Sequence, residues 1–181
     1  MIRRAVLAAL LFAAPAWAAD DPLSAAANSA FLAANAAKTG TVTRPSGLQY
    51  RVLKTGFGRR PGGGDVVRVS FKAALIDGRV VDSTPPSLPA TMAMSGVGLR
   101  GLAEALALMH EGDRWQVVIP SSLGFGVKPA GGGAVPPNQT LIFDLTLISA
   151  ATPQPGETLP ENPLTYWSNG REMGGAFTIH P

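Results

Sequence analysis

The chain of 181 residues contains no cysteine and only two histidines, His110 and His180. The absence of cysteine excludes disulfides, thiolate nucleophiles, cysteine-ligated zinc and a lipid anchor on an N-terminal cysteine. Neither histidine stands at a spacing that suits a metal site. A Ser-His-Asp triad through His110 lacks a serine in a Gly-x-Ser-x-Gly turn. We therefore expect no metal, no cofactor and no covalent hydrolase chemistry.

A hydrophobic run long enough to cross a membrane is also missing. After Arg3 and Arg4, the uncharged run ends at Ala19 after about 15 residues, whereas a bilayer needs ~20. The sequence Ala16-Trp17-Ala18 places small residues where a signal peptidase reads them. We expect residues 1–18 to be a cleaved signal peptide rather than a membrane anchor, so the protein should be periplasmic or secreted.

Charge is scarce as well, at 15% of residues against 46% apolar residues, which favours a packed core over disorder. Loss of Arg3 and Arg4 with the signal peptide would lower the formal net charge from +3 to +1. Nucleic-acid binding is therefore not expected. The 21 glycines and 16 prolines indicate many turns between strands.

The segment that follows, residues 19–40, is expected to be a short helix. Asp21 suits its N-cap, Pro22 its first turn and Gly40 its C-terminal stop. Apolar residues three and four positions apart form a narrow stripe that should pack on the rest of the chain. The stripe consists of Leu23, Ala27, Phe31 and Ala34.

From Leu48 onward the hydrophobic period changes to two, which predicts strands over residues 48–55, 66–75, 114–120 and 140–149. Asp77-Gly78 predicts a hairpin turn after the second of these. One helix is expected from Leu99 to Met109, with Leu102 and Leu106 facing the core. Several strands and one internal helix predict an α+β domain with an antiparallel sheet. Residues 151–181 read as a proline-rich extended tail. Its aromatic residues, Tyr166, Trp167 and Phe177, either pack on the domain or bind a partner.

The stretch "GVGLRG", residues 96–101, matches the dinucleotide-binding pattern G-x-G-x-x-G. That site requires a preceding strand, a βαβ unit and an acidic residue about 20 positions later. Here a proline-rich segment precedes the glycines, and the strand after the helix ends in Pro120-Ser121-Ser122 without an acid. We therefore interpret these glycines as a loop entering the helix, with Gly98 and Gly101 permitting a tight turn.

Four separated segments resemble the FKBP-type peptidyl-prolyl isomerases in order and spacing: "SGLQYRVLKTGFG", "VRVSFKAALIDGRVVDS", "GLRGLAEALALMHEGDRWQVVIPSSLGFG" and "GGGAVPPNQTLIFDLTLIS". The resemblance covers residues 41–150 and implies an FKBP-like sheet half-wrapped around one short helix. "FLAANAAKTGTVTRPSGLQY" is further similar to the exported macrophage infectivity potentiator-like subgroup, whose long N-terminal helix mediates dimerisation. Only the last part of that helix is recognisable here. The resemblance is therefore compatible with two oligomeric states. We expect a monomer, and the alternative is a dimer through the N-terminal helix.

By this resemblance, Asp82 is the pocket carboxylate, Phe143 cups the proline ring, and the Leu99 N–H holds the substrate carbonyl. The other positions implied to bind substrate are Phe71, Val81, Met92, Val97, Leu102, Phe125 and Val135. An apparent one-residue insertion makes Gly98 the rival of Val97 in this alignment. Without the resemblance, Phe143, Leu102 and Leu99 would be read as ordinary core residues.

Five of these positions depart from the family, which usually has Tyr at 71, Phe at 81, Phe at 92, Trp at 102 and Tyr at 125. The pocket stays apolar, but a substrate hydrogen bond and a flat aromatic floor are lost. The resemblance implies a peptidyl-prolyl cis-trans isomerase of reduced activity that assists folding of exported, proline-containing proteins. The alternative is a non-catalytic chaperone or peptide-binding module on the same scaffold.

Overall fold

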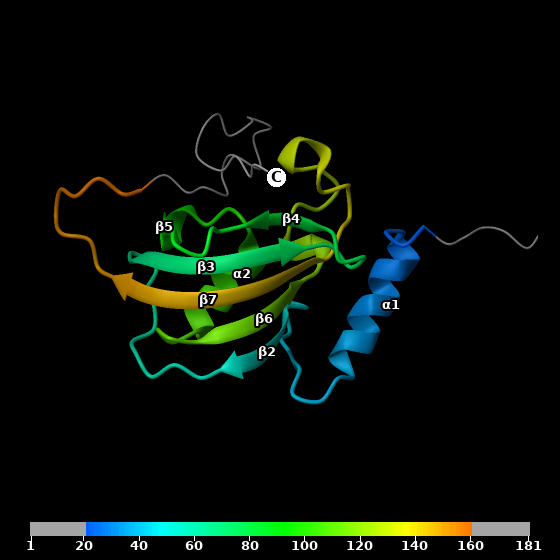
Figure 1. Cartoon of the computed structure of the whole chain (residues 1–181), viewed down its shortest axis with the longest axis horizontal. Coiled ribbons are helices and arrows are strands. Elements are labelled where there is room, and N and C mark those ends of the chain that lie inside the picture. The colour runs from blue at the N-terminus through cyan, green and yellow to red at the C-terminus, as the bar shows by residue number, and fades with distance from the viewer. Residues whose placement is uncertain (1–20, 161–181) are drawn as a thin grey trace, which may run out of the picture.

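A computed structural model of the chain describes residues 21–160 (Figure 1). The predicted signal peptide and the tail aromatics Tyr166, Trp167 and Phe177 lie outside the described residues. The helices are α1 (Ala25–Ala36) and α2 (Arg100–Leu108), and three short 3₁₀ turns are η1 (Met94–Gly96), η2 (Ser121–Leu123) and η3 (Gly131–Gly133). The strands are β1 (Val42–Thr43), β2 (Gln49–Lys54), β3 (Val66–Ala74), β4 (Val80–Ser83), β5 (Ala90–Ala93), β6 (Arg114–Ile119) and β7 (Leu141–Ala151).

Within residues 21–160 the strands form one sheet in the order β1-β2-β6-β7-β3-β4, with β5 paired to β3. Every pairing is antiparallel. Inward and outward residues alternate as expected for a sheet with one buried face. In β7, for example, Leu141, Phe143, Leu145 and Leu147 are buried.

Helix α2 packs on the buried face of the sheet and closes the core (Figure 1). Leu99 and Met109 are its caps, so the predicted range of Leu99 to Met109 is confirmed to within one residue at each end. Leu102 and Leu106 have no exposed surface, because they face the inner side chains of the strands. This architecture confirms the predicted α+β fold with an antiparallel sheet around one short helix.

The predicted hairpin after the second long strand is confirmed. β3 pairs with β4 across a turn in which Gly78 has φ +89° and the Leu75 N–H donates to Arg79 O. Glycine suits this turn because side chains disfavour positive φ.

The glycines of "GVGLRG" do not form the tight turn that we expected. Gly98 lies in the irregular segment between η1 and α2, outside any turn, and none of the three glycines has positive φ. Gly101 instead lies in the first turn of α2, buried against β6. A Cβ atom at Gly101 would lie 2.6 Å from Ile119 Cγ2. The packing requires glycine at this position because α2 approaches the sheet closely.

Helix α1 begins differently from the prediction. Ser24, not Asp21, is its N-cap, and the Ser24 hydroxyl accepts a hydrogen bond from the Ala27 N–H at 3.1 Å. The Asp21 carboxylate accepts the Leu23 N–H in the turn before the helix. The helix ends at Ala36, and Gly40 lies in the following turn with φ +81°.

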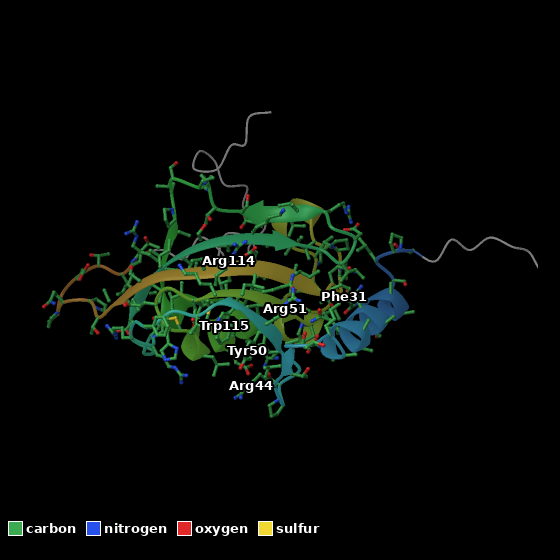
Figure 2. The ribbon with its side chains drawn as sticks, turned by 60° about the horizontal axis from the view of Figure 1, so that its bottom comes forward. Phe31, Arg44, Tyr50, Arg51, Arg114 and Trp115 are labelled. Atoms are coloured by element: carbon green, nitrogen blue, oxygen red, sulfur yellow. The ribbon has the colours of Figure 1, made fainter. Side chains whose placement is uncertain are left out.

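The face of α1 that packs on the domain agrees with the predicted apolar stripe only in part. Leu23, Ala27 and Phe31 are partly buried, whereas Ala34 is exposed, and the fully buried residues of the helix are Asn28 and Asn35. The two asparagines can be buried because amide side chains of the domain satisfy them with hydrogen bonds. Figure 1 shows α1 at the end of the sheet where β2 and β7 begin, and Figure 2 shows Phe31 at this end.

At the β2–β6 side of the sheet, the rings of Tyr50 and Trp115 stack with centroids 4.3 Å apart (Figure 2).

Neither described helix is long and apolar enough to cross a membrane.

Candidate functional site

The apolar residues predicted for the pocket are brought together in the core cluster under the sheet. Six of them are buried members of this cluster: Phe71, Met92, Leu99, Leu102, Val135 and Phe143. Three more are partly buried and pack against it: Val81, Val97 and Phe125. The structure therefore groups every apolar site candidate in one cluster with three partly exposed members.

Asp82 is placed beside this cluster by the strand register. It stands opposite Ala73 of β3, and Ala73 stands opposite Phe143 of β7. Directly opposed residues in antiparallel strands point to the same face of the sheet. The carboxylate therefore lies on the same face as the Phe143 ring, two strands away.

The environment of Asp82 penalises its charge. Partial burial raises the pKa of its carboxyl above the ordinary value, while a hydrogen bond from the Ser83 N–H opposes this shift. The Ser83 N–H, 2.7 Å from Oδ1, is the sole hydrogen-bond donor to this carboxylate within residues 21–160. Because residue 71 is phenylalanine rather than tyrosine, no hydroxyl is available there to share the charge.

The rings of Phe71 and Phe143 form an aromatic pair, with centroids 5.8 Å apart and planes tilted by 48°. This tilted geometry is favoured between aromatic side chains. Leu102, in the first turn of α2, belongs to the same cluster and occupies the position where the family usually has tryptophan. The cluster therefore combines an aromatic wall with an aliphatic base.

The Leu99 N–H stands at the N-terminal end of α2. It donates no hydrogen bond to any acceptor in the described part of the chain. Helix N-termini have free N–H groups and a partial positive charge. Leu99 itself is 2% exposed, so this N–H is a candidate donor to the carbonyl oxygen of a molecule that reaches it.

Two loops carry the remaining candidates. Phe125 follows η2 and is partly buried against the cluster. Val135 is held by two backbone hydrogen bonds with Ala130, at 3.0 and 3.1 Å, across the loop that contains η3. The orientation of these loops determines where the two side chains lie.

Of the two rival positions for this pocket residue, Val97 and Gly98, the packing favours Val97. Val97 packs against the cluster, whereas Gly98 is exposed and a Cβ atom there would meet nothing within 4 Å. Within residues 21–160 no group of three histidine or acidic residues could hold a metal ion.

Sequence reasoning missed the two amide pairs that fasten α1 to the domain. Asn28 bonds to Gln139 and Asn35 bonds to Gln49. The available signal was two asparagines seven residues apart in a helix made largely of alanine. Buried polar side chains need partners, so this spacing indicates one polar docking face.

A family model described as "FKBP-type peptidyl-prolyl cis-trans isomerase" matches residues 58–148. A second, described as "Domain amino terminal to FKBP-type peptidyl-prolyl isomerase", matches residues 16–52 and so includes α1 and β1. The first range contains every candidate site residue named above.

Individual proteins agree with these matches. The chain is 47% identical to "Outer membrane protein MIP" of Legionella longbeachae over 121 residues, 66% of this chain and 51% of that protein. It is 39% identical to "Macrophage infectivity potentiator" of Trypanosoma cruzi over 132 residues, 72% of this chain and 67% of that protein. The crystal structure of FkpA from Escherichia coli superposes with a TM-score of 0.65 at 32% identity, covering 72% of this chain and 60% of that one. The chain spans about half the length of several curated relatives that it matches.

Proposed function

The chain belongs to the family of FKBP-type peptidyl-prolyl cis-trans isomerases, and from this membership we propose that it accelerates the cis–trans isomerisation of Xaa-Pro bonds in exported proteins. The observation that carries the proposal is the coincidence of the matched range with the apolar cluster that flanks Asp82 and the Leu99 N–H. Export rests on the predicted signal peptide at residues 1–18. The clients would be unfolded or nascent chains that contain proline.

The chemistry needs few groups. Rotation about a peptide bond has a barrier of ~18–20 kcal/mol, so an Xaa-Pro bond isomerises over tens of seconds without a catalyst. The twisted transition state has lost amide resonance and is less polar than the planar ground state. An apolar surface that excludes water therefore stabilises the transition state relative to water.

Four of the candidate residues have distinct roles in this scheme. The Phe143 ring, supported by Phe71, provides the surface for the proline ring. The Leu99 N–H holds a substrate carbonyl in place while the bond rotates. Asp82 supplies a charge on the same side, where it interacts with the dipole of the rotating amide. None of these steps forms a covalent intermediate.

The five departures from the usual family residues support a lower activity. Phenylalanine at position 125 lacks the tyrosine hydroxyl, and a hydrogen bond of this kind contributes ~0.5–1.5 kcal/mol. Leu102 provides a narrower base for the proline ring than the usual tryptophan. We therefore expect slower turnover than in members that retain these aromatic residues.

A second candidate is a chaperone or peptide-binding module without catalysis. The same five departures favour it, and so do the exposed apolar side chains of Phe57, Leu88 and Val127 on loops. Three features favour the isomerase: Asp82, the Phe71–Phe143 pair, and a Leu99 N–H that donates to no acceptor within residues 21–160.

One experiment separates the two functions. We expect the purified full chain to accelerate cis-to-trans conversion of a leucyl-proline peptide, measured by protease-coupled absorbance or by exchange in magnetic resonance. A parallel assay measures suppression of aggregation of an unfolded client. Absence of peptide isomerisation together with suppressed aggregation would establish the chaperone and refute the isomerase.

A further inference from the structure

We propose that Asn28 of α1 is a positioning residue for the two loops that carry Phe125 and Val135. The proposal rests on the isomerase function and extends it, because it assigns the N-terminal helix a part in shaping the substrate site. The argument follows a continuous set of hydrogen bonds from α1 to both loops.

The Asn28 side chain is 5% exposed and makes hydrogen bonds in two directions. Its Oδ1 accepts the Thr140 N–H at 2.8 Å, and its Nδ2 donates to Gln139 Oε1 at 3.2 Å. Nδ2 also donates to Leu23 O and Ser24 O, at 3.1 and 3.0 Å, which orients the amide on the helix. One side chain of α1 therefore holds both residues that precede β7.

From Gln139 the hydrogen bonds continue toward the Val135 loop. Gln139 Nε2 donates to Pro137 O at 3.0 Å and to Leu23 O at 3.1 Å. Pro137 lies two residues after Val135 in the chain. The end of the Val135 loop is thus tied to the beginning of α1.

The Phe125 loop is reached through the residue between Pro137 and Gln139. The Asn138 N–H donates to Gly126 O at 2.7 Å, and Gly126 directly follows Phe125. Asn138 has φ +61°, a left-handed conformation that asparagine adopts more readily than most other residues. Thr140 in turn leads into β7, which carries Phe143 three residues later.

The Asn35–Gln49 pair is a matched comparison within the same helix. Asn35 Nδ2 donates to Gln49 Oε1 at 2.8 Å, and Gln49 Nε2 donates to Leu32 O at 3.0 Å. Asn35 is as deeply buried as Asn28, at 4% exposure. Its bonds lead to β2, which carries none of the candidate site residues. Both pairs fasten α1, but only the Asn28–Gln139 pair leads to the site loops.

Removal of the Asn28 amide would leave buried groups without partners. The Thr140 residue is 1% exposed, so its N–H could regain a hydrogen bond only if the backbone before β7 moved or water entered. Either change would alter the position of the Gln139–Pro137 segment. Small displacements of substrate-binding groups reduce catalysis strongly.

The test compares Asn28→Ala with Asn35→Ala in the full chain, at a temperature where circular dichroism shows both to be folded. We expect Asn28→Ala to lower kcat/KM for the leucyl-proline peptide roughly tenfold through loop displacement. Asn35→Ala should change it less than about twofold, because its bonds do not reach the loops. Equal decreases of kcat/KM in the two variants would show that α1 only stabilises the domain, and would overturn the proposal.

Amide hydrogen exchange provides a readout that does not depend on activity. In Asn28→Ala the amides of Thr140, Asn138 and Val135 should lose protection, while Asn35→Ala leaves them protected. If the wild-type chain proves inactive on the peptide, the proposed function fails, yet this exchange pattern still decides whether Asn28 positions the loops. Unchanged protection in Asn28→Ala contradicts the inference.

If Asn28→Ala does not fold, the same pairs are tested from the domain side. Gln139→Ala releases Pro137 O but leaves Asn28 bonded to Thr140, and Gln49→Ala is its counterpart in the other pair. The proposal requires exposure of the Val135 amide to exchange and a lower kcat/KM in Gln139→Ala alone. Indistinguishable behaviour of these two variants would overturn it.

Discussion

At the scale of single residues, Asp82 combines the functional position that we propose for it with a cost to stability. Its partial burial raises the pKa of the carboxyl, because water no longer fully solvates the charge and, within residues 21–160, the Ser83 N–H alone compensates. Between the ordinary pKa and the raised one, the folded chain binds a proton more tightly than the unfolded chain. Ionised Asp82 therefore destabilises the fold above its folded pKa, and this cost disappears as the pH falls toward 3.8.

The first prediction at this scale is that Asp82→Asn lowers activity and raises stability at neutral pH. We expect kcat/KM to fall about tenfold, the effect of one lost charged interaction. The melting temperature at pH 7 should exceed that of the wild type, and the difference should shrink as the pH is lowered toward 4. Calorimetry across this pH range and the peptide assay check both parts.

Asp77→Asn is the matched control, since Asp77 is a carboxylate of the same hairpin that pairs with Arg79 away from the cluster. It should leave kcat/KM unchanged and should not raise the melting temperature. A stabilising Asp77→Asn, or an Asp82→Asn of full activity, contradicts the role assigned to Asp82.

At the scale of elements, the approach of α2 to β6 positions Leu102, the base of the proposed site. Gly101 permits this approach, since a Cβ atom there would lie 2.6 Å from Ile119 Cγ2 and 3.2 Å from Leu123 Cβ. At a distance below 3.0 Å, either the helix, the strand or the Ile119 side chain must shift. Leu102 follows Gly101 directly, so displacement of α2 would also move the base of the cluster.

The corresponding prediction is that Gly101→Ala destabilises the domain. Overpacking of a buried contact costs about 1–3 kcal/mol, which exceeds the gain of up to ~1 kcal/mol from the higher helix propensity of alanine. Urea unfolding measures the change. Gly98→Ala is the control, because nothing lies within 4 Å of its Cβ position, and its effect should stay within about 0.5 kcal/mol. A Gly101→Ala variant as stable as the wild type would show that α2 does not require this close contact.

At the scale of the whole molecule, α1 packs on the domain of its own chain. Its buried face is satisfied by the Asn28–Gln139 and Asn35–Gln49 pairs. The residues exposed on its other side are mostly alanine, which bury little apolar surface on contact with a second copy. A stable dimer through this helix would need a larger apolar face.

We therefore predict that the full chain is a monomer. Light scattering at micromolar concentration should return a mass near 18.7 kDa, or that mass less the signal peptide after processing. A mass near twice this value would show that α1 or another surface mediates dimerisation. In that case, the mass of Asn35→Ala shows whether the dimer requires α1 packed on its own domain, because this variant removes one of the two amide pairs that hold the helix there.

The sheet and α2 could be predicted from the sequence because the burial of one face of each element produces a hydrophobic period in the residues of that element. Inward residues of β3 and β7 alternate with polar ones, and α2 repeats leucine at helical spacing. The candidate site could be predicted only by resemblance. Leu99, Leu102 and Phe143 have the same apolar pattern as any core residue. Strand register places Phe143 on the same face as Asp82, and packing of α2 on the sheet brings Leu99 and Leu102 into the same core cluster as Phe143.

The sequence by itself determined the fold class, the hairpin at Gly78 and the limits of α2, because residues close together in the chain specify each of them. Only the tertiary structure decided that Asn28 and Asn35 are the buried residues of α1 and why residue 101 is glycine. Asn35 and Asn28 find their partners 14 and 111 positions away, and Gly101 meets Ile119 of another element. No local period records such contacts, because the hydrogen bonds and close approaches exist only once the distant segments have met.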